Sequence, residues 1–183
     1  AIVGTVSGDS ISFGTAVVFE SAYSTLMASV FDSSNNKIVL AYRDGGNGGA
    51  GTAIVGTVSG TSISFGSPVV FESGNTNNSI GISFDTSANK VVIAFRDNDD
   101  SNYGKAIVGT VSDTSISFGS AATFNSATTS YVSIAYDVAN NKHVIGYGSS
   151  SGNAKVATVS GTSISFGSAV EFESGAAIYV QAL

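Results

Sequence analysis

The chain repeats itself, and this repetition constrains its fold more than any other feature. The segment AIVGTVSG starts at Ala1 and recurs at Ala53 and Ala106, and a diverged copy, AKVATVSG, starts at Ala154. Each copy is followed by a block that begins SISFG, and the first three copies are also followed by a block resembling FDTSANKVVIAF. A repeat of about 50 residues predicts an array of similar small units that bury their apolar faces against one another.

Each complete unit contains four short apolar runs that we interpret as strands. The runs are rich in Val, Ile, Phe and Thr, are bounded by turn residues and are too short for most helices. Links such as Ser59-Gly60-Thr61-Ser62 suit two-residue hairpins between the third and fourth strands. The glycine after Phe in the fourth strand, Gly66 in one unit, predicts a bulge. We therefore expect an all-β fold.

The second strand of each unit is apolar at consecutive positions, as in residues 38–42. A strand with one face in water would alternate, so we expect this strand to be covered on both faces. Small sheets stacked face to face provide that cover, and they predict a β-propeller of four-stranded blades. Small residues in the first strand, such as Ala28 and Gly81, suit a crowded hub. The alternative is a β-solenoid or a stacked sandwich fibre.

The repeat makes residues 1–183 one repeat domain. Residues 1–21 are expected to supply the outer strands of a partial blade, 22–74, 75–127 and 128–175 three blades, and 176–183 the first strand of another partial blade. A blade made from both ends would lack its second strand and would leave backbone groups unpaired. This predicts that the chain is an excerpt of a longer array, that it closes imperfectly, or that further copies or missing chain complete the open blade.

Composition excludes several classes of function. The formal net charge of −6 disfavours nucleic acid and anionic membranes as partners. The chain has no cysteine, which excludes disulfides and thiolate chemistry, and its single histidine excludes multi-histidine metal sites. No apolar run approaches the roughly eighteen residues that a membrane-spanning helix needs. No nucleophile elbow or phosphate-binding glycine loop is present, so we expect no enzyme.

The repeat pattern GTVSGTSISFG…VVFES…SFDxxxNKVVIAFRD resembles tandem repeats in large tail or surface proteins of environmental bacteriophages and bacteria. The resemblance covers essentially the whole chain. It implies an extracellular, cell-surface or virion setting and an attachment or structural role. It assigns no catalytic residue to this sequence.

Loops at one end of the predicted blades differ between units, whereas the turns at the other end are nearly constant. Variable loops on a rigid scaffold are where specificity usually lies, so we expect a surface glycan or a receptor to bind this end. The candidate ligand-binding residues are Asp44, Asn75, Asn77, Asp97, Asp99, Tyr103 and Tyr131. The alternative is a purely structural repeat, a tail or fibre component that assembles with further copies, in which these loops drift without constraint.

The variable loop from Asp97 to Tyr103 also carries the weak candidates for a metal site. Asp97, Asp99 and Asp100 provide closely spaced carboxylates, which calcium favours. The loop does not follow the twelve-residue calcium-binding pattern, so we interpret it as a solvated acidic loop and expect no cofactor, with calcium as the alternative. The Arg-Asp pair that ends the second strand, as in Arg96-Asp97, is expected to form a structural ion pair.

Other recurring polar residues are interpreted as structural. The aspartate before each Asn-Lys turn, as in Asp85, is expected to accept hydrogen bonds from backbone N–H groups two residues on. The glutamate at the end of the outer strand, as in Glu72, is interpreted as a charge that discourages edge-to-edge pairing. His143 occupies a position that is apolar in the other units, Ile38 and Val91, and is expected to be a packed core residue.

Overall fold

The chain folds into three antiparallel β-sheets, which confirms the all-β prediction. The structure is a computed structural model and describes residues 1–178 and 180–182. In that part of the chain the helical structure is limited to one turn of 3-10 helix, η1 (Gly45–Asn47), and no helix could cross a membrane. None of the three sheets closes on itself.

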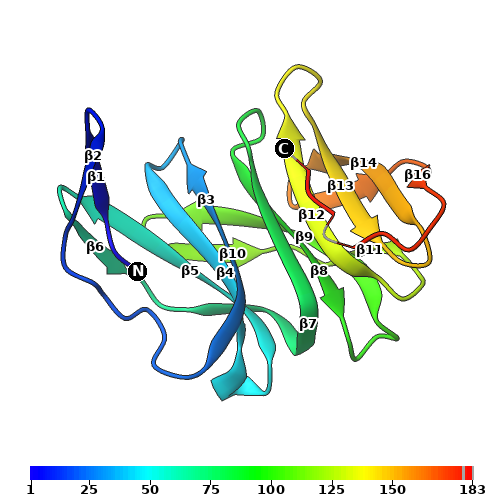
Figure 1. Cartoon of the computed structure of the whole chain (residues 1–183), viewed down its shortest axis with the longest axis horizontal. Helices are drawn as coiled ribbons and strands as arrows, with labels where there is room; N and C mark the ends of the chain where they lie inside the picture. Colours follow the sequence, from blue (N-terminus) through cyan, green and yellow to red (C-terminus); the bar gives the residue numbers. More distant parts are fainter. Residues whose placement is uncertain (179, 183) are drawn as a thin grey trace.

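Each complete unit is a meander of antiparallel strands, and the units follow one another across the molecule (Figure 1). Unit one (residues 22–74) contains β3 (Ser24–Asp32), β4 (Lys37–Asp44), β5 (Ala50–Ser59), β6 (Ser62–Phe65) and the first half of β7 (Val69–Asp85). Unit two (residues 75–127) contains the second half of β7, β8 (Lys90–Asp97), β9 (Tyr103–Ser112), β10 (Ser115–Phe118) and β11 (Ala122–Asn125). Unit three (residues 128–175) contains β12 (Ser130–Asp137), β13 (Lys142–Gly148), β14 (Gly152–Ser160), β15 (Ser163–Phe166) and β16 (Val170–Glu173). The leading unit (residues 1–21) contributes the hairpin of β1 (Gly4–Ser7) and β2 (Ser10–Phe13).

Units one and two share a single nine-stranded sheet because β7 is continuous across their boundary. Its first half pairs with β5 and its second half pairs with β8. The link stays extended because the Thr76 N–H donates to the carbonyl of Gly49, while Thr76 also lies opposite Asp97 in the ladder. Unit three forms a separate five-stranded sheet. The sequence predicted separate small sheets for all units and gave no sign of this continuity.

The turns have the predicted chemistry. Asp85 accepts hydrogen bonds from the N–H groups of Ser87 and Ala88, and Asn89 completes that turn with a φ of 54°. The hairpin between β5 and β6 has a positive φ at Gly60, its first central residue, as a type II′ turn requires. In Figure 1 the Asn-Lys turns of the three units lie along the upper edge, and η1 lies at the lower edge.

The fourth strand is interrupted at the predicted bulge. Phe65 lies opposite Gly56 and Val69 lies opposite Ala53, so β5 advances by three residues where the outer chain advances by four. An extra residue in one strand moves the following side chains to the other face of the sheet. The fourth strand therefore presents Phe65 to the preceding unit and Val69 to the following unit.

The second strand of unit two is buried on both faces, as predicted, whereas β4 and β13 are covered less completely. Every residue of β8 from Val91 to Phe95 is fully buried. Val91, Ile93 and Phe95 belong to a core cluster shared with unit one, whereas Val92 and Ala94 belong to a cluster shared with unit three. The strands of unit two are thus packed between units one and three, and the core of the protein lies at the junctions between units.

The first strands of the units surround a common hollow of ≈ 370 Å³. Its lining includes Ala28 from β3, Gly81 from β7, Ser133 from β12 and Val180. The described residues of the 176–183 segment run beside β12 without forming a ladder, and the N–H of Ala182 donates to the Ser133 hydroxyl at 2.9 Å. Residues 179 and 183 of that predicted strand lie outside the described residues.

Candidate functional site

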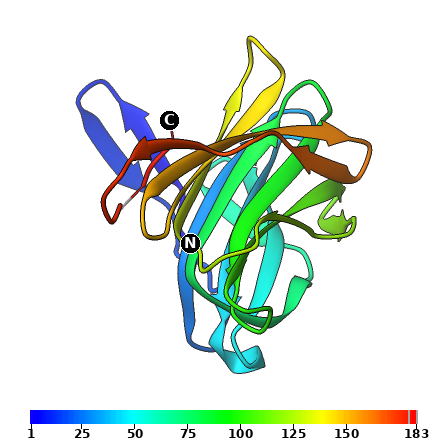
Figure 2. The ribbon, with the colours of Figure 1, turned by 90° about the vertical axis from the view of Figure 1, so that its right-hand side faces the viewer.

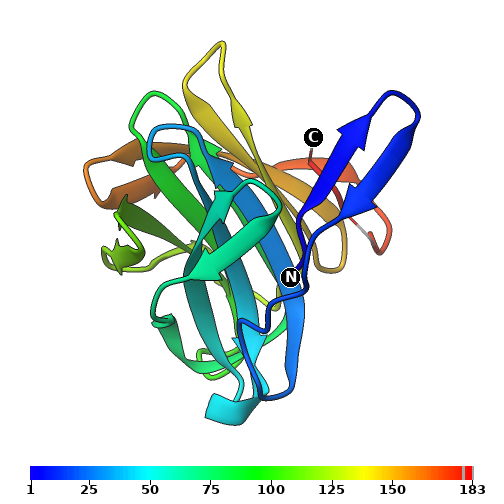
Figure 3. The same ribbon diagram turned by 90° about the vertical axis from the view of Figure 1, so that its left-hand side faces the viewer.

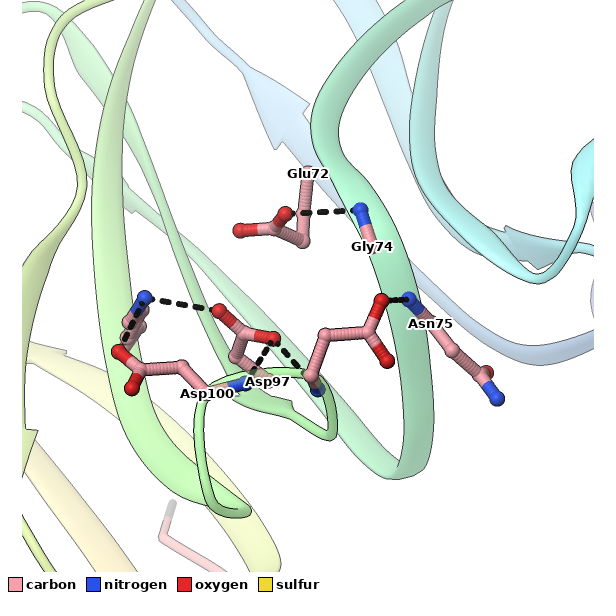
Figure 4. A network of polar contacts seen from close by, with 7 residues as sticks. Glu72, Gly74, Asn75, Asp97 and Asp100 are labelled. Atoms are coloured by element: carbon pink, nitrogen blue, oxygen red, sulfur yellow. Dashed lines mark hydrogen bonds and ion pairs between the residues drawn. The ribbon is translucent and has the colours of Figure 1, made fainter.

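Asp97 is the centre of a polar network at the variable-loop end of unit two (Figure 4). One carboxylate oxygen accepts hydrogen bonds from the N–H groups of Asp99 and Asp100, at 3.0 and 3.2 Å. The other oxygen forms an ion pair with the Lys105 ammonium at 2.7 Å. Asp97 is buried, so both of its oxygens are committed to holding the loop that follows β8.

Lys105 also reaches the carboxylate of Asp100, at 2.8 Å. Burial alone would lower the pKa of Lys105, but the hydrogen bonds and negative charges of Asp100 and Asp97 outweigh burial and raise it. The ammonium therefore stays charged and lies between two of the three carboxylates that were weak candidates for calcium. No group of three or more metal-ligating side chains is found among the described residues.

Asp99 and Asn75 connect unit two to unit one. The N–H of Asn75 donates to a carboxylate oxygen of Asp99 at 3.2 Å, and Nε of Arg43 donates to the Asn75 side-chain oxygen at 3.1 Å. Arg43 lies in β4 and Asp99 lies in the loop after β8, so the chain of contacts crosses the junction. Glu72 lies beside this network and accepts a hydrogen bond from the Gly74 N–H at 2.9 Å (Figure 4).

The predicted Arg-Asp ion pairs are not formed. Neighbouring residues of a strand point to opposite faces, so Arg43 and Asp44 cannot pair with each other. Arg96 instead donates from Nε to the Asn102 side chain at 3.1 Å. Asp44 caps η1 by accepting hydrogen bonds from the N–H groups of residues 46 and 47. Each member still fixes a loop, but through a separate partner.

The remaining predicted ligand-binding residues do not converge on one point. Asn77 is exposed and its side-chain oxygen accepts the N–H of Asn78, whereas Tyr103 is half-buried at the start of β9. Tyr131 is half-buried, has a φ of 51°, and its N–H donates to the Asn78 side chain at 3.1 Å. The structure brings Asn75, Asp97 and Asp99 together and distributes the others along the loops.

A buried cluster of Ser83, His143 and Asp85 was missed by the sequence analysis. The Ser83 hydroxyl lies 2.8 Å from Nδ1 of His143, and a carboxylate oxygen of Asp85 lies 3.4 Å from Nε2. The longer contact is an electrostatic one, because Nε2 has no hydrogen-bond partner. Burial lowers the pKa of His143, although the charge of Asp85 opposes this shift.

The cluster has the residue types of a hydrolytic triad but not its accessibility, since all three side chains are buried. It links β7 of unit two to β13 of unit three. A signal for it was present in the repeat: Ser83 replaces Val30 and Ala135, and His143 replaces an apolar residue in both other units. Polar residues at two positions that are apolar in the other units, in adjacent units, indicate that the two side chains form a hydrogen bond with each other.

The junctions between units share one close contact. A Cβ atom placed on Gly14 would lie 1.9 Å from the carbonyl oxygen of Thr61, in the hairpin turn of the following unit. The same distance is 1.8 Å from Gly66 to Thr114 and 2.1 Å from Gly119 to Thr162. These are the bulge glycines that the repeat aligned. Only a residue without a side chain fits here, so each glycine allows the hairpin turn of the next unit to pack directly against it. We call this contact the glycine seat.

Aromatic rings repeat at the same junctions. Phe71 of unit one packs against Phe95 and Phe118 of unit two, with ring centroids 5.1 and 5.9 Å apart. The Phe124 ring makes the equivalent contacts with Tyr147 and Phe166 of unit three, at 5.2 and 5.9 Å. Phe19 of the leading unit contacts Tyr42 and Phe65 of unit one in the same way.

Comparisons with protein-family models, with curated proteins and with solved structures find no match to this chain.

Proposed function

We propose that this protein is a non-enzymatic structural repeat, a tail or fibre component whose units stack on further units of the same kind. The observation that carries the proposal is the glycine seat, which occurs at three successive junctions with the same partner. A contact repeated in this way is built for unit-on-unit assembly. The polar residues of the variable loops favour the same role, because Asp97, Lys105 and Arg43 are committed to holding the loops and the junction.

We propose that the units are propeller-type blades. Support comes from β8, which is covered on both faces, and from the small residues that the first strands present to a common hollow. The resemblance of the repeat to tail and surface proteins supports an extracellular, cell-surface or virion setting. The burial of Ser83, His143 and Asp85 supports the absence of hydrolytic chemistry.

Sedimentation velocity on the intact chain over a wide concentration range tests the assembly function. We expect species heavier than the 18.3 kDa monomer to increase with concentration. The solvent should contain at least about 0.15 M salt, so that repulsion between chains of charge −6 is screened. A single species of monomer mass at every concentration would contradict the proposal.

A second candidate function is recognition of a surface glycan or a receptor. It is favoured by the exposed side chains of Asn77 and Asp99, which stand on loops that the Asn75 and Asp97 contacts hold rigid. Rigid loops bind with a smaller entropic cost than mobile ones. A glycan array with the intact chain, compared with Tyr103→Ala and Tyr131→Ala variants, tests it. Binding that both variants weaken would favour recognition, and binding that neither variant changes would place the contact elsewhere.

A further inference from the structure

The side of each unit that faces the following unit, which we call the forward face, is apolar. In unit one it comprises Val55, Val69 and Phe71, in unit two Val108, Ala122 and Phe124, and in unit three Val156, Val170 and Phe172. Unit two covers the forward face of unit one, and unit three covers that of unit two. Phe71 and Phe124 are consequently 7% and 1% exposed.

Among the described residues, Val156, Val170 and Phe172 of unit three lie open, although Val180 lies against Gly146 on the same side of that unit. Phe172 rests on Gly152, as Phe71 rests on Gly51, yet Phe172 is 57% exposed and Val156 is 48% exposed. Gly167 occupies the place of the seat glycines, but a Cβ atom placed there would meet nothing closer than a carbonyl oxygen at 3.7 Å. Figure 2 views the molecule from this side, with β14 to β16 at the front.

The opposite side of the leading unit exposes the matching surface. Phe13, Ile11 and Val6 of the β1–β2 hairpin correspond to Phe118, Ile116 and Val111, which unit two packs against unit one. In the leading unit these three side chains are exposed, Phe13 by 62%. Figure 3 shows the hairpin standing clear of the other strands. Its turn residue Asp9 corresponds to the threonine that each glycine seats.

From this correspondence we infer that the β1–β2 hairpin of a second copy docks on the forward face of unit three. The docked hairpin places Phe13 against Phe172 and the Asp9 carbonyl over Gly167, which repeats the junctions within the chain. The hairpin of the same molecule does not reach this face, because the hairpin and β16 lie at opposite ends of its longest axis (Figure 1). A head-to-tail contact of this kind generates rings or filaments.

This inference rests on the proposed assembly function and names its surface and partner. The sharpest test uses two variants that each block one side of the contact. Gly167→Ala adds one methyl group that the single molecule accommodates but the docked turn would not. Phe13→Lys removes the exposed ring from the hairpin. Gly175→Ala is the matched control, because Gly175 is exposed and its added Cβ would lie 3.5 Å from the Glu173 carboxylate.

Sedimentation velocity should show that Gly167→Ala and Phe13→Lys each weaken self-association by about tenfold to a hundredfold, as overpacking or truncating a fitted contact does. Gly175→Ala should associate like the unaltered protein. A mixture of Gly167→Ala with Phe13→Lys should form one-to-one dimers, because each variant keeps the side that the other has lost.

The experiment distinguishes failure of the assembly function from failure of the docking inference. If the unaltered protein never associates, both the assembly function and the docking inference are wrong. If it associates but the two variants behave like the control, the assembly function stands and the docking inference is wrong. If both variants fail alone and the mixture also fails, the contact is not head-to-tail and the inference is again wrong.

Discussion

Gly119 lies directly beneath the carbonyl oxygen of Thr162, so close that a Cβ atom on Gly119 would be 2.1 Å from that oxygen. The two residues belong to consecutive units, and their contact fixes how unit three is placed on unit two. The same contact recurs at the two preceding junctions. The spacing between units is therefore set by backbone against backbone, which leaves little freedom for alternative placements.

We predict that Gly119→Ala destabilises the protein by about 1–3 kcal/mol, because the added methyl group forces the hairpin turn of unit three away from its seat. Gly167→Ala should change the unfolding free energy of the monomer by less than about 0.5 kcal/mol, because its methyl group would make only an ordinary contact, 3.7 Å from a carbonyl oxygen. Urea unfolding of dilute protein measures both. Equal effects of the two substitutions would show that the seat contact does not matter.

A second prediction concerns the buried pair between units two and three. His143→Val should cost about 1–3 kcal/mol, because it leaves the Ser83 hydroxyl buried without its partner. The double variant Ser83→Ala with His143→Val carries residues that other units have at these positions, and it should recover most of the loss. The unfolding free energies of the four proteins form a double-mutant cycle. Strictly additive losses would contradict the proposed pairing.

The third prediction is that the free energy of unfolding depends on pH through the protonation of His143. Burial lowers its pKa in the folded protein, whereas the unfolded chain takes up a proton near the ordinary value of 6.5. The unfolded state thus binds more protons, so this contribution to stability is complete above pH 6.5 and is lost as the pH falls below it. The slope should reach at most about 1.4 kcal/mol per pH unit.

The double variant provides the control for this pH dependence. Between pH 7 and 5.5 it should lose less stability than the unaltered protein, because it lacks the imidazole. Asp85 is the charged group that faces the ring, and its backbone hydrogen bonds remain in the variant. Parallel pH profiles for the two proteins would show that the pKa of His143 is the same in the folded and unfolded states, which would contradict this prediction.

A fourth prediction concerns the variable-loop network. Lys105→Met should cost about 1–3 kcal/mol, because it leaves the buried Asp97 carboxylate without its charged partner. Asp100→Asn, at a more exposed side chain, should cost about 1 kcal/mol or less. Thermal unfolding of the two variants checks this order. A larger loss of stability for Asp100→Asn than for Lys105→Met would show that the network does not depend mainly on Asp97.

The strands and turns could be predicted from the sequence because the repeat supplies several copies of each one. Gly60 and Asp85 occupy turn positions whose backbone geometry demands those residue types, and comparing the units reveals this. The partners of side chains could not be predicted in the same way. Arg43 binds Asn75 rather than Asp44, since strand geometry separates neighbouring side chains. The contact between Ser83 and His143 depends on how two sheets stack, which the pattern of a single unit does not encode.

For the candidate site residues as well, the sequence predicted positions but not side-chain partners. The repeat located the variable loops, because loop composition differs visibly between units. It did not reveal that Asp97 and Lys105 neutralise each other or that Asp99 accepts a hydrogen bond from the backbone of Asn75. These partners are set by how the loop after β8 folds back on β7 and β9, which the composition of the loop does not encode. The glycine seats were visible as an invariant residue of the repeat, but their partner became apparent only in three dimensions.

We propose that units stack on like units through the forward face, both within one molecule and between molecules. Hydrogen–deuterium exchange at low and high protein concentration tests it most directly, because it reports which amides become protected. We predict slower exchange at high concentration in the β1–β2 hairpin and in β16, with little change in the loops after β4 and β8. Protection confined to those loops, or exchange that does not depend on concentration, would contradict the claim.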